Sequence, residues 1–376
     1  MNNFFTILFL LVCSSVFAKL IKVNPDTSLF RYVGRFDLSN PSKPQFAHSG
    51  NQIEFQFKGS EILVGLSDIS SGGPENKNYF NVIVNGKVVD VIACDQGLKY
   101  YPIKLSQIDS FNTIEIFKRT EASCAIAVFH GVKYEIGEIK KTISKQRKIE
   151  WIGDSFMAGY GNMLSIAPPP NDNPSTGFHA ENENGYEAFG AITSRRLKAD
   201  YSSVVVSGHG VYRNFDLSEE GTLPKVYSLI FPEEVYTGKP YNFIFQPDLI
   251  VIKIGTNDFG AEMQKPPAMA DSTRFVETYL VFLDEVILKN PNSKIVLAVG
   301  GGLTDYFPKG LKRLSRFRAW VRRVQREVEL KYNTEIDFFE FKPMQPPYGE
   351  DWHPTIKAQQ KFADEITPYL KQLMNW

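Results

Sequence analysis

Ser155 carries a small hydroxyl side chain directly after a short apolar run, in the stretch IEWIGDS at residues 149–155. One interpretation is that Asp154 and Ser155 cap a following helix, because short polar side chains satisfy its unpaired N–H groups. The other is that Ser155 is a nucleophile activated by a base elsewhere in the chain. The second interpretation requires that the chain also supply a base and donors for a developing negative charge.

A candidate base lies far downstream, in the loop Glu350-Asp351-Trp352-His353-Pro354. His353 is suited to take a proton from Ser155 because the pKa of histidine lies near neutrality. A neighbouring carboxylate would hold its ring in the right tautomer and stabilise the imidazolium. We favour Asp351 for this role, with Glu350 second and a serine–histidine dyad third.

The donors for a tetrahedral oxyanion come from three places. We expect the backbone N–H of Ser155, the backbone N–H of Gly210 or Gly208, and the side-chain amide of Asn257 to form the oxyanion hole. Such a donor is typically worth about 3 kcal/mol of barrier. Together with Ser155 and His353, these groups predict acyl transfer through a covalent acyl-enzyme. Asp154 and Asp258 are interpreted as carboxylates that brace their loops.

These residues follow strands in a chain that alternates strands and helices after residue 149. The apolar runs and helical periodicity predict strands at 149–152, 204–206, 249–254, 294–299 and 336–341, and helices at 186–197, 275–288, 314–328 and 356–370. Pro368 indicates that the last helix kinks or ends early. This alternation predicts a parallel sheet covered by helices, and such sheets carry their active sites at the carboxyl ends of the strands. The loop at 167–184, rich in Pro, Asn and Gly, is expected to lie at the surface near the nucleophile and to shape one side of the cleft.

The chain before this region has a different character. Residues 19–138 show short strand patterns without a convincing helix, and Asn85-Gly86 is a strong two-residue hairpin signal. This predicts a β-sandwich of jelly-roll type. The polar and basic stretch 139–148 is interpreted as a linker, and 149–376 as the second domain.

The N-terminus resembles a secretory signal peptide over residues 1–18. An apolar run from Phe4 to Cys13 is too short to span a bilayer, and small residues precede a cleavage site after Ala18. We therefore expect a secreted or periplasmic protein that does not associate with a membrane after the signal peptide is cleaved. The remaining Cys94 and Cys124 could form one disulfide or stay as two buried thiols.

The charge balance excludes one class of partner. Lys plus Arg and Asp plus Glu number 42 each among 376 residues, so no global field favours nucleic acid. The histidines show no metal-ligand spacing with each other or with cysteine. We expect neither a metal nor a cofactor, and a monomer.

Four blocks in the chain resemble, in the same order, those of the GDSL or SGNH hydrolase superfamily. They are Gly153-Asp154-Ser155, the glycines at 208 and 210, Gly255-Thr256-Asn257-Asp258, and His353-Pro354. Further segments narrow the resemblance to carbohydrate esterase family 2: Tyr32-Val33-Gly34-Arg35-Phe36, Lys118-Arg119-Thr120-Glu121, Gly161-Asn162, Gly210-Val211-Tyr212-Arg213-Asn214 and Asp351-Trp352-His353-Pro354.

The resemblance implies a jelly-roll domain joined to an SGNH-type α/β/α domain with a parallel sheet, acting as an acetyl xylan esterase on plant polysaccharides such as xylan or glucomannan. The superfamily usually places its Asp three residues before the His, where this chain has Glu350. Trp352, Tyr212 and Arg213 are candidates for substrate contact. Two alternatives stay open: an esterase for lipid or aryl esters, and a carbohydrate-binding protein with a relic esterase domain.

Overall fold

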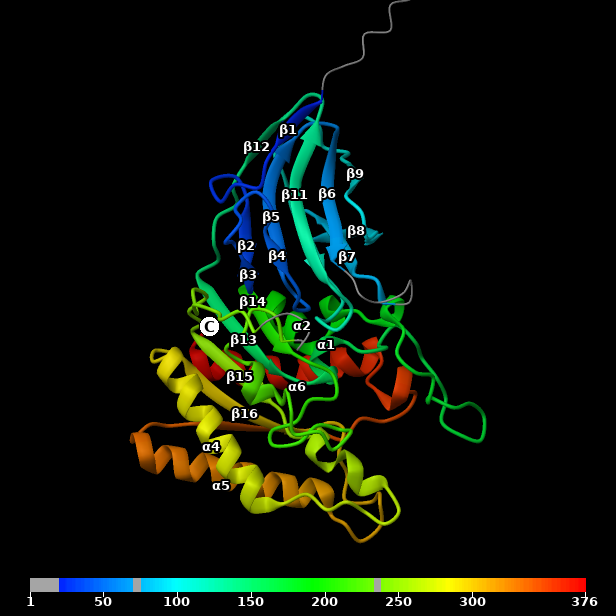
Figure 1. Ribbon diagram of the computed structural model, residues 1–376, viewed down its shortest axis with the longest axis vertical. Helices are drawn as coiled ribbons and strands as arrows, with labels where there is room; N and C mark the ends of the chain where they lie inside the picture. The colour runs from blue at the N-terminus through cyan, green and yellow to red at the C-terminus, as the bar shows by residue number, and fades with distance from the viewer. Residues whose placement is uncertain (1–19, 70–75, 233–237) are drawn as a thin grey trace, which may run out of the picture.

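The computed structural model describes residues 20–69, 76–232 and 238–376, so the predicted signal peptide lies outside the described residues. Figure 1 shows two β-sheets at one end of the molecule and a helix-flanked sheet at the other. This arrangement confirms the predicted order of a sandwich followed by an α/β domain.

The sandwich consists of two antiparallel sheets. The first contains, in spatial order, β3 (Phe36–Asp37), β4 (Gln45–Phe46), β11 (Ile126–Tyr134), β6 (Glu61–Ile69) and β9 (Lys99–Lys104), with β1 (Ile21–Val23) also paired to β11. The second contains β12 (Glu138–Lys140), β5 (Gln52–Lys58), β10 (Asn112–Lys118), β7 (Tyr79–Val84) and β8 (Lys87–Ala93), with β2 (Arg31–Val33) also paired to β5. Alternate residues such as Ile53, Phe55 and Phe57 are fully buried, as expected where one face of a strand packs on a core.

Local details of the sandwich test three sequence predictions. Asn85 and Gly86 lie between β7 and β8 with φ of 50° and 79°. Positive φ at both central residues is what a two-residue type I′ turn requires, so the predicted hairpin is confirmed. The predicted linker is wrong at both ends, because β12 extends to Lys140 and pairs with β5, and the next strand begins at Arg147. Cys94 and Cys124 are buried free thiols.

The second domain is built on one parallel sheet. Its strands lie in the order β14 (Ala199–Val205), β13 (Arg147–Gly153), β15 (Leu249–Lys253), β16 (Lys294–Gly300) and β17 (Asp337–Phe341). β13 pairs in parallel with the central strand β15, so the loops after Gly153 and after Lys253 lie at the same edge of the sheet. These loops carry Ser155 and Asn257.

Helices cover both faces of this sheet (Figure 1). The helix α2 (Phe189–Arg196) packs against α6 (Ile356–Met374), and α4 (Ser272–Lys289) packs against α5 (Arg313–Tyr332). Each pair shares a separate apolar core with one face of the sheet. The short elements are α1 (Ser155–Ala158), α3 (Leu223–Val226), η2 (Ala180–Asn182), η3 (Gly185–Glu187), η4 (Asn257–Met263) and η5 (Glu350–Trp352).

The last helix corrects one prediction. α6 continues past Pro368 to Met374 instead of ending early. Pro368 is exposed, while Ile366 and Leu370 on either side of it are buried in the core, so the apolar face of the helix continues across the proline. The packing of that face compensates for the hydrogen bond that a proline cannot donate.

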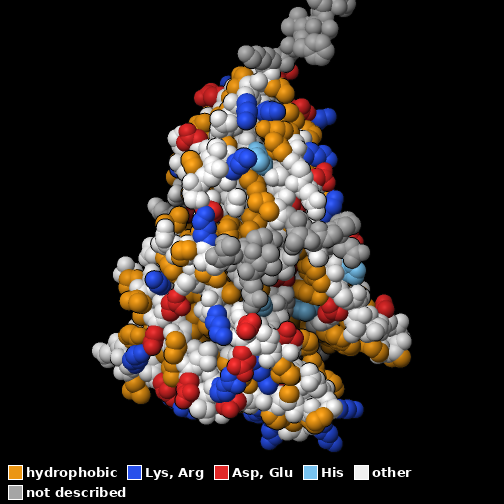
Figure 2. Space-filling model, in the orientation of Figure 1, with side chains coloured by type: hydrophobic (Ala, Val, Ile, Leu, Met, Phe, Trp, Pro, Cys, Tyr) orange, Lys and Arg blue, Asp and Glu red, His pale blue; other side chains and the backbone are white. Residues whose placement is uncertain are grey.

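The distribution of surface charge and the hydrophobicity of the helices are relevant to nucleic-acid and membrane binding. On the face shown in Figure 2, basic and acidic side chains are interspersed, in keeping with the equal totals of 42 in the sequence. Within the described ranges, no helix is long and apolar enough to cross a bilayer.

Candidate active site

Ser155 occupies the first turn after β13, where the structure separates the two interpretations, helix capping and nucleophilic catalysis. Asp154 is the N-cap of α1, and its Oδ1 accepts a hydrogen bond of 3.1 Å from the Phe156 N–H. The Ser155 hydroxyl makes a different contact, because its Oγ lies 2.7 Å from Nε2 of His353. Asp154 therefore caps the helix, and Ser155 is free to serve as nucleophile beside a base.

The orientation of His353 is set by its own loop. Its Nδ1 lies 2.9 Å from the main-chain carbonyl oxygen of Glu350. A carbonyl oxygen only accepts hydrogen bonds, so Nδ1 carries the proton and the lone pair of Nε2 faces Ser155. The Tyr160 ring stacks on the imidazole at 4.2 Å between centroids, and the Phe156 ring meets it edge-on at 5.5 Å.

The same surroundings control the charge of the base. Burial lowers the pKa of the His353 imidazole from its ordinary value, and the hydrogen bond to the Glu350 carbonyl partly opposes this effect. The neutral ring is thus favoured at neutral pH, which is the state required of a general base.

The prediction that Asp351 orients His353 is wrong. Its carboxylate accepts hydrogen bonds from the N–H groups of Thr176 and Gly177, at 3.0 and 3.1 Å, and from the Tyr160 hydroxyl at 2.6 Å. The physical reason is that these three donors, two of them in the loop at 167–184, satisfy the carboxylate at a place away from the imidazole Nδ1.

The second choice, the side chain of Glu350, does not contact His353 either. It is fully buried and accepts hydrogen bonds from the backbone N–H of His179 and the amide of Asn182, at 3.1 and 2.7 Å. His179 Nδ1 lies 2.8 Å from Oε1, the carboxylate oxygen that also accepts from Asn182. Both acidic residues hold the 167–184 loop, and the arrangement at Ser155 is the third alternative, a serine–histidine pair oriented by a main-chain carbonyl.

The expected oxyanion donors are brought to the same edge of the sheet, with one exception. The Gly210 N–H donates to Oδ1 of Asn214 at 3.1 Å, so it is not free for an oxyanion and that alternative is wrong. The N–H groups of Ser155 and Gly208 have no hydrogen-bond acceptor among the described residues. One N–H of the Asn257 amide donates to the His209 carbonyl at 2.8 Å, which orients the amide and leaves its second N–H available.

The glycines in this loop are required by its geometry. Gly208 has a φ of +78°, a left-handed conformation that favours glycine, and open space surrounds the position where a Cβ would stand. At Gly210 a Cβ would lie 2.0 Å from the carbonyl oxygen of Arg213. Asp258 holds the loop in place, because its carboxylate accepts hydrogen bonds from the backbone N–H groups of Val211, Tyr212 and Arg213. This matches the bracing role expected for Asp258.

Both domains of the chain match families of known proteins. Residues 32–141 match the carbohydrate esterase 2 N-terminal family, and residues 151–361 match the GDSL-like lipase/acylhydrolase family. The chain belongs to carbohydrate esterase family 2. Its second domain is the GDSL, or SGNH, hydrolase domain of that family.

Individual family 2 relatives agree over most of the chain. It is 31% identical over 92% of its length to the cellulase/esterase CelE of Acetivibrio thermocellus, of which it spans 39%. It is 27% identical over 92% of its length to an acetylxylan esterase / glucomannan deacetylase of Cellvibrio japonicus, of which it spans 88%. Among solved structures, a family two carbohydrate esterase from Clostridium thermocellum in complex with cellohexaose superposes with a TM-score of 0.81 at 29% identity, covering 92% of this chain and 99% of that one.

The residues expected to contact substrate in this family 2 esterase separate into two groups. Trp352 is 41% exposed and packs on Tyr348, so its indole remains available beside His353. Tyr212 and Arg213 are buried, and their contact with substrate stays a prediction. The Tyr212 hydroxyl accepts from the Asp271 N–H, and the Arg213 guanidinium donates to the carbonyls of Asp258 and Ala268, so both brace the loop.

Sequence reasoning missed Phe215, which follows them. It is 51% exposed, its N–H donates to the Gly208 carbonyl at 2.8 Å, and its ring packs over Gly260 in η4, the short helix that begins at Asn257. An exposed ring beside two candidate oxyanion donors is a candidate substrate contact. The available signal was an aromatic residue two positions after Arg213 in the same loop.

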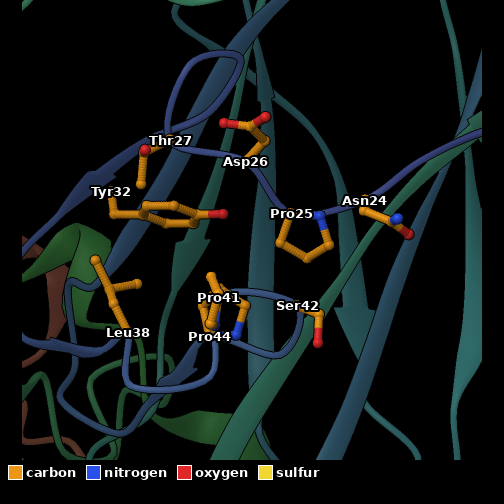
Figure 3. A pocket seen from close by; sticks show the side chains of 9 residues that line it. All are labelled: Asn24, Pro25, Asp26, Thr27, Tyr32, Leu38, Pro41, Ser42 and Pro44. Atoms are coloured by element: carbon orange, nitrogen blue, oxygen red, sulfur yellow. The ribbon is translucent and has the colours of Figure 1, made fainter.

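Two further features lie outside this site. A cavity of about 380 Å³ is formed in the sandwich by the turn after β1, by Tyr32, and by the β3–β4 loop with its prolines (Figure 3). None of its lining residues belongs to the candidate active site. In the described part of the chain, no group of three or more His, Cys, Asp or Glu side chains is arranged to hold a metal ion.

Proposed function

We propose that this family 2 esterase removes O-acetyl groups from plant polysaccharides by a serine mechanism. The observation that carries the proposal is the 2.7 Å contact between Ser155 Oγ and His353 Nε2, with the proton of His353 on Nδ1. Nε2 takes the hydroxyl proton as Oγ attacks the acetyl carbonyl. The resulting oxyanion accepts hydrogen bonds from the backbone N–H groups of Ser155 and Gly208 and from the side-chain amide of Asn257.

The intermediate then collapses. His353 returns the proton to the departing sugar oxygen, which leaves an acetyl ester on Ser155. A water molecule then attacks the ester carbonyl and gives a proton to Nε2. The second intermediate collapses as His353 returns that proton to Ser155 Oγ, which releases acetate and restores the free enzyme. Apart from this water, the catalytic groups are side-chain and backbone groups of the chain itself.

The choice of substrate rests on the relatives. Two Cellvibrio japonicus proteins named acetylxylan esterase / glucomannan deacetylase align over at least 90% of this chain. The exposed rings of Trp352 and Phe215 offer flat apolar faces on which a pyranose can stack. We further propose that the enzyme is exported, because residues 1–18 have the pattern of a signal peptide and a polymeric substrate lies outside the cell.

The test is acetate release from acetylated xylan and acetylated glucomannan by the wild type and by Ser155→Ala. We expect release by the wild type, loss of at least about a thousandfold in the variant with an unchanged melting temperature, and full activity in a strong chelator. Acetate release that survives Ser155→Ala would remove the nucleophile assignment. Activity that a chelator abolishes and zinc restores would contradict the metal-free mechanism.

Two alternatives have distinct outcomes in the same assay. Hydrolysis of a long-chain ester without acetate release would point to a lipase-like enzyme. A carbohydrate-binding role is favoured by one observation, the cellohexaose bound to the Clostridium thermocellum relative. It predicts retention of the polysaccharide by Ser155→Ala and the wild type alike, without turnover of any ester.

A further inference from the structure

A lysine lies in the apolar layer beneath the nucleophile. Lys253 ends β15 in the run LIVIK and is 1% exposed. Leu249 and Val251, at alternate positions of the same strand, belong to the apolar core on that face of the sheet. Burial lowers the pKa of the Lys253 ammonium, and the neighbouring Asp154 opposes that change. A charge in such a layer is costly unless it has a partner, so its position calls for an explanation.

The partner is the residue next to the nucleophile. Lys253 Nζ lies 3.8 Å from Oδ1 of Asp154, and both side chains are 1% exposed. The strand register places Lys253 opposite Gly153, immediately before Asp154. Nζ also lies 4.4 Å from the centroid of the Phe156 ring, a cation–π contact. The ammonium therefore stands under the turn that presents Ser155.

The charge of Asp154 would otherwise work against catalysis. A carboxylate adjacent to Ser155 repels the oxyanion that forms there, and it favours the protonated state of His353, whose pKa it raises. Among the described residues, the other titratable groups that face His353 are Asp351 and Glu350 from its own loop and Tyr160 from the turn after α1. All of these are acidic groups, and Lys253 supplies a positive charge from the sheet side.

We propose that Lys253 is a positioning residue that cancels the charge of Asp154, so that the N-cap of α1 does not oppose the oxyanion or hold a proton on His353. The inference rests on the proposed serine mechanism and concerns the electrostatics of the same site. Lys253 makes no contact with the reacting atoms. It acts through Asp154.

The experiment is the pH dependence of kcat/KM on a soluble aryl acetate. In Lys253→Met the charge of the Asp154 carboxylate is uncompensated, so the pKa of His353 rises and the acid limb moves to higher pH, by an amount on the order of one unit. In Asp154→Asn the ammonium is uncompensated, so the acid limb moves to lower pH. Asparagine still caps a helix, and this variant tests the proposal even if Lys253→Met does not fold.

The double variant and a matched control complete the design. Lys253→Met with Asp154→Asn removes both charges, so the acid limb returns to the wild-type position. Lys294→Met removes a lysine from the exposed amino end of the neighbouring strand β16 and leaves the profile unchanged. Folded single variants whose acid limbs stay at the wild-type pH would overturn the proposal. An inactive wild type would instead be a failure of the proposed esterase function.

Discussion

Besides Ser155, the His353 ring contacts the Glu350 carbonyl, Tyr160 and Phe156, none of which offers a carboxylate. The Glu350 carbonyl fixes Nδ1, Tyr160 stacks on one face of the ring, and Phe156 meets it edge-on. A main-chain carbonyl orients the imidazole as well as a carboxylate does, but it carries only a partial charge. It therefore gives less stabilisation to the imidazolium that forms during the reaction.

This geometry predicts that Asp351→Ala retains most of the catalytic power. The variant loses hydrogen bonds to Thr176, Gly177 and Tyr160, so the loop at 167–184 loosens. We expect kcat on an aryl acetate to fall less than about tenfold, compared with about 10⁴-fold when a triad aspartate is replaced. Steady-state kinetics would measure this, with Asp172→Ala, an exposed residue of the same loop, as the control. A thousandfold loss of kcat in Asp351→Ala would restore the carboxylate to the catalytic role.

At the scale of elements, the loop after β14 is positioned by η4. Asp258, fully buried in η4, accepts three consecutive backbone N–H groups of that loop. This contact fixes the loop that carries Gly208 relative to Asn257 in η4, so the two proposed oxyanion donors keep their spacing.

Replacing this carboxylate should cost both stability and rate. Asp258→Ala leaves three buried N–H groups without an acceptor, at about 1–3 kcal/mol for each unpaired group before relaxation. We expect a lower melting temperature and a kcat at least about tenfold lower, because misplaced oxyanion donors act only on the transition state. Thermal unfolding and aryl acetate kinetics measure the two effects. Asp216→Ala, in the exposed part of the same loop, should change neither, and an equal effect of both variants would refute the specific role of Asp258.

Elements were more predictable from the sequence than contacts. Apolar runs such as 249–254 and helical periodicity at 314–328 identified β15 and α5 because burial on one face imposes those patterns. Ser155, His353 and Asn257 could be selected because each follows or precedes such an element. The hydrogen-bond partners of Asp351 and Arg213 could not be predicted, because a carboxylate or a guanidinium beside an active site binds whichever donors and acceptors the folded loops present. Only the three-dimensional arrangement specifies those.

At the scale of the whole molecule, the sandwich contacts the catalytic loops directly. The carboxylate of Glu121, in the turn after β10, accepts the Ser207 N–H at 2.7 Å, one residue before Gly208. The Glu121 N–H in turn donates to the buried carboxylate of Glu183 at 2.9 Å, and the Arg119 carbonyl accepts the Gly185 N–H at the same distance. The first domain thus holds the loop that carries Gly208 and the end of the 167–184 loop.

The consequence is that a substitution in the sandwich should impair catalysis without touching the substrate. Glu121→Ala removes the acceptor of the Ser207 N–H and allows the Gly208 amide to move. We expect kcat on an aryl acetate to fall about tenfold or more with KM little changed, because an oxyanion donor contributes mainly to the transition state. The control is Glu138→Ala, an exposed glutamate on β12 of the same sandwich, which should leave kcat unchanged. If Glu121→Ala lowers the melting temperature but preserves kcat, the sandwich supports the fold alone. A selective loss of kcat would mean that both domains build the active site.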